Sequence, residues 1–403
     1  MSPEPGFVRE LRRDAAAAPK EILEVPTAQP GQVTETDLAA HRLPDAEELV
    51  FVDGRFAPEH SRFPAGNARV AQPLSQAVAR ATETLEMHLG RHAGDEGAVA
   101  ANNARFTDGL FVDLAPRQAA EAPIHLLHVS TGRAAAASHV RNLVVAGSRS
   151  QALVVESYVG LAGAATLTTA VTELVAGADS RIQHAVLQLE NLHGAHHGHA
   201  AIRLDRGANV ATTTLSVGGL AATRGLDVRL LREGAEAQLD GLLLATSDQS
   251  VSAPTFVEHA APHTTSRQLW KAVLDGRARG AFLGNVLVQS AAQKTNAEQT
   301  NRNLLLSDGA KMDSTPQLEI NADDVKCSHG STIGQLSQDA LFFLRSRGIG
   351  PEDARLILTK AFAHEVIERA PQTVAPILEH LLTQWFACRH TGAAGDGAKA
   401  VHA

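Results

Sequence analysis

The residues with the clearest chemical potential are a cysteine and a histidine two positions apart, Cys327 and His329, in the stretch DDVKCSHGST. If residues 318–329 form a strand, alternate side chains share a face, so Val325, Cys327 and His329 lie together. The side chains of Cys327 and His329 then point in the same direction, with their backbone positions roughly 6 to 7 Å apart. This arrangement does not suit a nucleophile and its base, because those two groups must point at each other.

The same pair fits the chemistry of soft-metal ligands better. A thiolate and an imidazole can donate to one metal ion or to neighbouring irons of a cluster, but such sites need about four ligands. The only other cysteine, Cys388, lies in a distant helical region. Cys327 and His329 could therefore form half of a site shared with another subunit. The alternative, and the main expectation from these residues alone, is a cysteine packed as a small hydrophobe beside a hydrogen-bonded histidine.

A second group of potential ligands is the segment LHGAHHGHA, which carries His193, His196, His197 and His199. Four imidazoles so close together could bind a transition metal. A loop interleaved with glycine does not fix a coordination geometry, so solvated loop histidines are the alternative and the main expectation.

Several common catalytic motifs are missing from the sequence. No lysine follows a glycine, which excludes a P-loop, and neither G-x-S-x-G, H-E-x-x-H nor C-x-x-C occurs. His259 and His263 are four positions apart, but Pro262 interrupts helical spacing between them, so both are expected to be structural. These absences argue against most common enzyme classes.

Composition limits the possible partners and location. The chain has 403 residues, a formal net charge of -8 and 44% hydrophobic residues, with no block rich in lysine and arginine. Neither nucleic acid nor a membrane is therefore an expected partner. The N-terminus lacks the apolar core of a signal peptide, and no apolar run could span a bilayer. We expect a cytoplasmic protein with both cysteines as free thiols.

Repeated glycine turns between apolar strands dominate the middle of the chain. They are centred on Gly147, Gly177, Gly207, Gly234, Gly276 and Gly309, at spacings of 27 to 42 residues. A near-constant period of this size indicates a solenoid whose units bury their apolar faces only by stacking. The pattern predicts a parallel β-helix, and the 42-residue gap predicts one coil with an insertion.

Helical patterns flank this core. LVFVDGRFAP predicts two strands joined at Asp53-Gly54, and residues 74–93 predict one amphipathic helix. After residue 336, Ser337 and Pro351 mark two helix starts, and a third helix follows. These helices either cap the open end of the solenoid or dock a partner. The predicted fold is mainly β, with an N-terminal helical and irregular region (1–100), a β-helix core (101–335), a C-terminal helical domain (336–390) and a disordered tail (391–403).

Residues 292–349, from AQKTNAEQTNRNLLLSDG through KCSHG to LRSRGI, resemble the signature region of the SufB/SufD family of iron–sulfur cluster assembly proteins. LVFVDGRF, DGLFVDL, VVESYVG and AFAHEVIERAP support the resemblance. The KCSHG and LRSRGI motifs are similar to those of the SufD branch. SufB chains carry a cysteine near NRNLLLSDG, where this sequence has none.

The resemblance implies a non-catalytic scaffold subunit with a β-helix core and helical flanks. Such a subunit pairs with SufB and docks one SufC ATPase through its C-terminal helices, which agrees with the missing P-loop. The family's Cys-Ser-His motif corresponds to Cys327, Ser328 and His329, with His329 the better ligand for a transient cluster at the SufB interface. No cofactor is expected to bind stably to the chain alone, and a homodimer is possible in isolation. The residues we assign to ATPase docking are Leu341, Phe342, Arg345, Arg347, Leu358, Phe362 and Val366.

Two other functions remain open from the residues alone. A stand-alone β-helix enzyme acting on polysaccharides would need paired carboxylates on adjacent coils. Asp205, Glu233 and Asp275 are the acidic residues nearest the repeats, and all three fall at turns. A purely structural β-helix would have no site at all.

Overall fold

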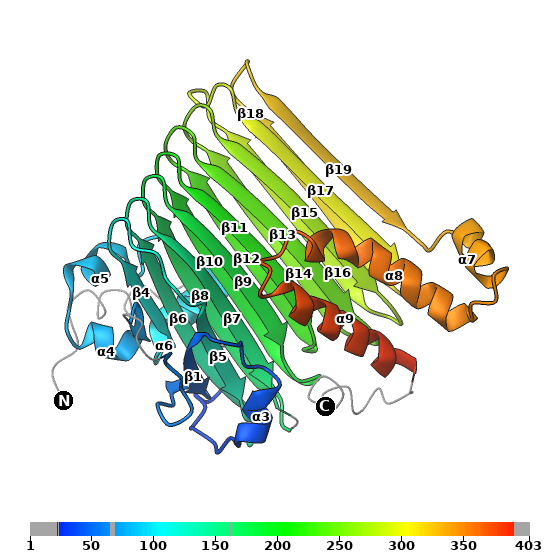
Figure 1. Ribbon diagram of the computed structural model, residues 1–403, viewed down its shortest axis with the longest axis horizontal. Coiled ribbons are helices and arrows are strands. Elements are labelled where there is room, and N and C mark those ends of the chain that lie inside the picture. The colour runs from blue at the N-terminus through cyan, green and yellow to red at the C-terminus, as the bar shows by residue number, and fades with distance from the viewer. Residues whose placement is uncertain (1–21, 23, 65–68, 162, 391–403) are drawn as a thin grey trace.

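The computed structural model describes residues 22, 24–64, 69–161 and 163–390. The chain winds into a flattened parallel β-solenoid of two facing sheets, so the mainly β prediction is confirmed (Figure 1). Successive strands alternate between a ten-stranded and a nine-stranded sheet, called here the odd-strand and even-strand sheets. Figure 1 shows the coils stacked side by side, from β1 and β5 near the N-terminal helices to β18 and β19 at the opposite end.

The strands of the coils follow one another in strict alternation. The odd-strand sheet holds β5 (Ile124–Ser130), β7 (Gln151–Gly160), β9 (Arg181–Leu189), β11 (Asn209–Val217), β13 (Glu236–Ala245), β15 (Thr265–Leu274), β17 (Asn296–Leu305) and β19 (Lys326–Gly334). The even-strand sheet holds β4 (Leu110–Leu114), β6 (Ala136–Ala146), β8 (Thr166–Ala176), β10 (Ala195–Leu204), β12 (Ala221–Leu230), β14 (Ser250–His259), β16 (Arg279–Val288) and β18 (Lys311–Ile320).

Alternation along each strand builds the interior. In β14, Val251, Ala253 and Val257 point inward and join the central apolar cluster, while the residues between them face outward. Large and small residues also alternate between coils. Trp270 of β15 is fully buried, and a Cβ at Gly241 of β13 would come within 2.2 Å of its ring. The missing side chain at Gly241 therefore makes room for the ring of its cross-strand neighbour Trp270 inside the solenoid.

The glycine turns lie at both edges of the solenoid. Those at Gly147, Gly177, Gly207 and Gly234 lead from an even to an odd strand, whereas the one at Gly276 leads from β15 to β16. The wide gap in the sequence pattern therefore spans one and a half coils, and the predicted insertion is wrong. The intervening turn after β13, around Ser247, has no glycine but adopts the same positive φ of 54°.

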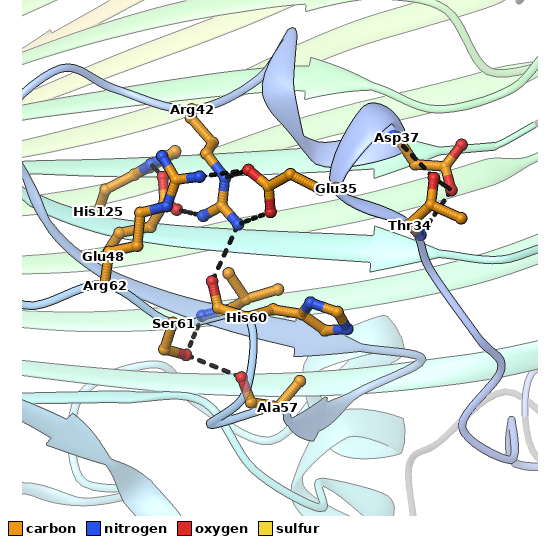
Figure 2. A network of polar contacts seen from close by, with 11 residues as sticks. Thr34, Glu35, Asp37, Arg42, Glu48, Ala57, His60, Ser61, Arg62 and His125 are labelled. Atoms are coloured by element: carbon orange, nitrogen blue, oxygen red, sulfur yellow. Dashed lines mark hydrogen bonds and ion pairs between the residues drawn. The ribbon is translucent and has the colours of Figure 1, made fainter.

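The N-terminal end is closed by its own chain. β1 (Glu47–Val52) extends the odd-strand sheet beside β5, and residues 55–62, including β2 (Arg55–Phe56), satisfy its outer edge. In the network of Figure 2, Arg42 donates to Glu35, to Glu48 and to the carbonyl of His60. Glu48 also lies 2.9 Å from His125 of β5. This network fixes α3 (Glu35–Ala39) against the first coil.

Short helices cover the outer face of the even-strand sheet at this end. β3 (Ala71–Pro73) leads into α4 (Leu74–Val78), followed by α5 (Glu83–His88) and α6 (Gly97–Arg105). The single helix predicted over residues 74–93 is therefore wrong. The helical path breaks at Ala81, whose φ of +46° lies in the left-handed region, although neither glycine nor proline marks the break.

Three helices follow the last strand: α7 (Gln338–Arg345), α8 (Pro351–Ile367) and α9 (Ala375–His390). Ser337 caps α7 and Pro351 begins α8, as predicted. Figure 1 shows α8 and α9 lying across the odd-strand sheet, where they pack on β11, β13 and β15. They cover a side wall, so the prediction that they cap the open end is wrong. In the described part of the chain, no helix is both long and apolar enough to cross a membrane.

Candidate functional site

The last coil is open. β18 and β19 are the outermost strands of their sheets, and each pairs with a neighbour on one side only among the described residues. Nearly every residue of β19 is exposed, so the last coil presents both unpaired backbone groups and side chains to the surroundings. The strand predicted over residues 318–329 is instead interrupted by a turn at 321–325, with β18 before it and β19 after it.

Cys327 and His329 both lie on the inward face of β19, which confirms that they share one side of a strand. Cys327 aligns with buried Ala297 of β17 and packs against the edge of the central apolar cluster. Burial raises the pKa of its thiol, with partial opposition from a backbone hydrogen bond to Ala297. Because the thiolate is the form that binds metal, Cys327 is a weakened donor at neutral pH.

His329 is the accessible member of the pair. It is exposed and aligns with Gln299, one coil earlier. Beyond it on the same face, Ser331 lies 2.7 Å from Ser314 of β18, and Ser314 donates to Asn301 of β17. These hydrogen bonds join the middle parts of three strands and hold β19 in register, so the imidazole stands on a fixed strand rather than on a loop.

The ligand set around this pair is incomplete within the chain. Over the residues that the structure describes, no group of three or more histidine, cysteine, aspartate or glutamate side chains is placed to hold a metal ion. Cys327 is a free thiol, and the side chain of Cys388 lies outside the described part. A metal cluster of the usual four ligands therefore needs donors from elsewhere.

The histidine-rich segment is a strand and not a loop. His193 lies in the preceding turn, whereas His196, His197 and His199 belong to β10. Alternation places His196 inside the solenoid and the other two on the outer face, so a single four-histidine metal site is wrong, and so is the solvated loop. Burial lowers the pKa of His197, and it lowers that of His199 to about 4.

The structure also places His259 and the acidic residues that the sequence analysis put at turns. His259 is fully buried, and its ring nitrogens lie 2.8 Å from the hydroxyls of Thr264 and Ser266, which confirms a structural role. Asp205 and Glu233 lie at turns from the even-strand to the odd-strand sheet, while Asp275 lies at the opposite edge. All three thus lie at turns, as the sequence predicts, and Asp275 is separated from the other two.

The predicted docking residues differ in their exposure. Phe342, Arg345 and Arg347 of the α7 region are exposed, with Phe342 at 74%, whereas Leu341, Leu358 and Phe362 are half-buried. Val366 is fully buried between α8 and the odd-strand sheet, so it serves to hold the helix in place.

Sequence reasoning missed Phe343, which is 54% exposed next to Phe342, with the Arg347 guanidinium 3.5 Å from its ring centroid. Two adjacent exposed phenylalanines in the segment LFFLR were the signal that could have revealed it.

A polar cluster inside the solenoid was also missed. Glu156 of β7 is fully buried, accepts hydrogen bonds from Thr172 and Tyr158, and lies 3.0 Å from His184. Burial alone would raise the pKa of Glu156, but the interaction with His184, the charge of Arg224 and the hydrogen bond from Tyr158 together lower it to about 2. The only tyrosine of the chain, in the stretch VVESYVG, was the available signal.

The fold and the open coil define a β-solenoid scaffold whose last described strand bears soft donors and has no partner at its outer edge among the described residues. A family model described as SUF system FeS cluster assembly, SufBD core domain, matches residues 128–362. The chain belongs to this SufB/SufD family, and the resemblance seen in the sequence is confirmed. Membership supports a scaffold role in iron–sulfur cluster assembly.

Curated relatives give the same assignment. An iron–sulfur cluster assembly SufBD family protein of Synechocystis is 32% identical over 360 residues, covering 86% of this chain and 79% of the relative. The iron–sulfur cluster assembly protein SufD of Escherichia coli is 30% identical over 327 residues, covering 80% of this chain and 75% of the relative. A chloroplastic protein of Arabidopsis, ABCI7, is 34% identical over 205 residues, or 51% of this chain and 43% of that protein.

Proposed function

We propose that this chain is the SufD-like, non-catalytic scaffold subunit of a SufBCD-type complex. It pairs with a SufB-like subunit at the open coil and docks a SufC-like ATPase on its C-terminal helices. The observation that carries this proposal is the unpaired terminal coil, with Cys327 and His329 facing it. The similarity to SufD of Escherichia coli supports the choice of branch.

The open coil has the chemistry of a strand-pairing surface. Unpaired edge strands offer rows of free N–H and C=O groups, which natural proteins protect or use for association. Ile320 of β18 and Ile333 of β19 are both large, exposed and apolar at this end. A second solenoid adding its own edge strands would continue both sheets and remove these side chains from water.

The nascent cluster is the cargo of this interface. His329 supplies an accessible imidazole, and Cys327 supplies a thiol whose raised pKa makes it the weaker donor. The remaining ligands come from the SufB-like partner, because the described residues of this chain hold no group of three donors. The chain therefore positions part of a ligand set and performs no bond chemistry of its own.

The ATPase docks on the surface around α7. Phe342 and Phe343 are exposed there, with Arg345 and Arg347 beside them. Aromatic residues and arginine are the usual anchors of protein interfaces. Rearrangement of the ATPase pair would move the two platforms relative to each other and open the buried interface, a two-state coupling of the kind that proteins use.

Reconstitution tests the proposal. The chain is co-expressed with the SufB-like subunit and the ABC ATPase of its own cell, and the purified complex is supplied with iron and sulfide. We expect His329→Ala to form the complex but to build less cluster, as measured by visible absorbance and iron content. Ser328→Ala, on the outward face of the same strand, is the matched control and should behave like the wild type. Failure to form a complex, or full cluster building by His329→Ala, would contradict the proposal.

A further inference from the structure

Gln299 of β17 is a buried amide without a hydrogen-bond partner. Its side chain faces the interior of the solenoid and is only 1% exposed. Neither its Nε2 nor its Oε1 atom finds a partner among the residues that the structure describes. A buried polar group without a partner costs free energy, and an apolar side chain of the same shape would avoid that cost. Packing alone therefore does not explain why a glutamine stands at this position.

The amide reaches across the interior towards the facing sheet. A Cβ at Gly284 of β16 would lie 2.7 Å from Gln299 Cδ and nearer still to its Nε2, so the side chain is extended towards that strand. His329 is the register partner of Gln299 on β19, and the two strands are parallel neighbours. Register partners lie on the same face, with their backbone positions about 5 Å apart. The unpartnered amide and the imidazole thus project side by side into the last coil.

The other groups beside His329 on this face are already engaged. Ser331 lies 2.7 Å from Ser314 of β18, and Cys327 packs against the central apolar cluster. A histidine that ligates a metal almost always donates its other ring N–H to an acceptor, which fixes the tautomer and the orientation of the ring. The amide oxygen of Gln299 is a neutral acceptor with no other donor among the described residues.

We propose that Gln299 is a positioning residue for His329. When a partner covers the last coil, Gln299 Oε1 accepts a hydrogen bond from the imidazole N–H, and the other ring nitrogen is left for the cluster. This bond satisfies two groups that would otherwise both be buried without a partner. The role rests on the proposed function and sharpens it, because it names the residue that sets the tautomer of the histidine ligand.

Gln299→Met tests this role, because methionine keeps the approximate shape of the side chain and removes the acceptor. In the reconstituted SufBCD-type complex, we expect cluster iron to pass to a chelator about tenfold faster than in the wild type. The Tm of the isolated chain should stay equal or rise, because the variant has lost an unpaired buried amide. Wild-type iron release, or a lowered Tm together with faster release, would overturn the role.

Two further variants separate positioning from packing. Gln268→Met, one coil deeper in the same register, is the matched control. It loses the 3.0 Å hydrogen bond from Thr255, so its Tm should fall while its iron release stays at the wild-type rate. Gln299→Glu keeps an acceptor oxygen and should release iron at close to the wild-type rate. Release as fast as in Gln299→Met would contradict the hydrogen bond to the imidazole.

A double variant shows whether the glutamine acts through the ring. Adding Gln299→Met to His329→Ala should not speed iron release further, and a further acceleration would contradict the role. If His329→Ala retains the cluster as well as the wild type does, the proposed function fails and this role fails with it. If His329→Ala loses the cluster while Gln299→Met does not, only the positioning role fails.

Discussion

The two ends of the solenoid are built in opposite ways. At the N-terminal end, all six residues of β1 are buried, and residues 55–62 satisfy its outer edge. At the C-terminal end, almost every residue of β19 is exposed, and its outer edge has no partner in the described chain. The outer edge of the terminal strand is thus paired at the N-terminal end and has no partner in the described chain at the C-terminal end. Natural proteins usually protect exposed sheet edges, so the contrast between the two ends supports the pairing proposed above.

The largest expected effect is at the closed end. Glu48 is 1% exposed and is held between Arg42 and His125, so Glu48→Gln leaves the buried guanidinium of Arg42 with only the exposed Glu35 as a counter-charge. We expect a loss of about 3 to 5 kcal/mol in the free energy of unfolding, measured by urea denaturation. Glu35→Gln, at the 57% exposed partner of the same arginine, should cost less than about 1 kcal/mol. Equal losses for both variants would show that the network does not seal this end.

The wall between the two ends should show a pH effect from Asp240, which lies beneath α8. Burial raises the pKa of this carboxyl to about 6, despite hydrogen bonding from Gln238 and the nearby Arg369. The folded chain then holds a proton that the unfolded chain has released, so the stability contributed by protonated Asp240 is lost as pH rises from about 4 to 6. In Asp240→Asn, the fall in unfolding free energy over this pH range should be smaller than in the wild type by about 2 to 3 kcal/mol.

Unfolding free energies measured from pH 4 to pH 7 would check this expectation. Asp205→Asn, at an exposed turn, is the control and should follow the wild-type curve. If Asp240→Asn and the wild type give parallel curves, the carboxyl is not held protonated under the helix.

At the open end, substitution should affect association more than folding. Ile333→Lys places a charge on β19, where the side chain is 49% exposed, and we expect at least a tenfold loss of affinity for the SufB-like partner, or about 1.4 kcal/mol. Leu283→Lys is a matched control, because Leu283 is 50% exposed on the outer face of β16. Affinities can be compared by titration of the purified subunits. Similar losses for both variants would mean that the open coil is not the pairing surface.

The smallest expected effect on stability is that of His329→Ala. The side chain is exposed at the open end, so its removal should change the unfolding free energy by less than about 0.5 kcal/mol. His259→Ala, which removes a buried ring bonded to two hydroxyls, should cost about 1 to 3 kcal/mol. Urea denaturation of the two variants would sharpen the contrast. A comparable loss for His329→Ala would indicate a structural role for this residue.

The sequence was informative where backbone geometry restricts residue choice. Glycine turns between apolar runs predicted the solenoid, and Ser337 and Pro351 marked helix starts, because few residues suit those positions. The break at Ala81 could not be seen, since an alanine, and not a glycine or proline, adopts the left-handed backbone there. The turn at 321–325 was overlooked although Asn321, Asp323 and Asp324 are typical turn residues.

The candidate site was predictable in part. Spacing alone placed Cys327 and His329 on one face, because alternation holds for any strand. It could not tell that this face belongs to the last coil, which only the full stacking order decides. The inward Glu156 and Arg224 were missed for a related reason. An isolated polar residue in a strand pattern normally faces water, and only the enclosing second sheet reverses that expectation.

The glycine turns up to Gly234 lie at one edge of the solenoid, and the turn at Gly276 lies at the opposite edge. This change of edge bears on how such a chain can change in length. Both edges accept the same kind of turn, so the repeating unit is a single strand with the turn that follows it. Inserting or deleting one strand with its turn would nonetheless move every later strand into the opposite sheet. The last two strands, β18 and β19, would then exchange sheets. Growth or shortening in this architecture must therefore come in full circuits of two strands.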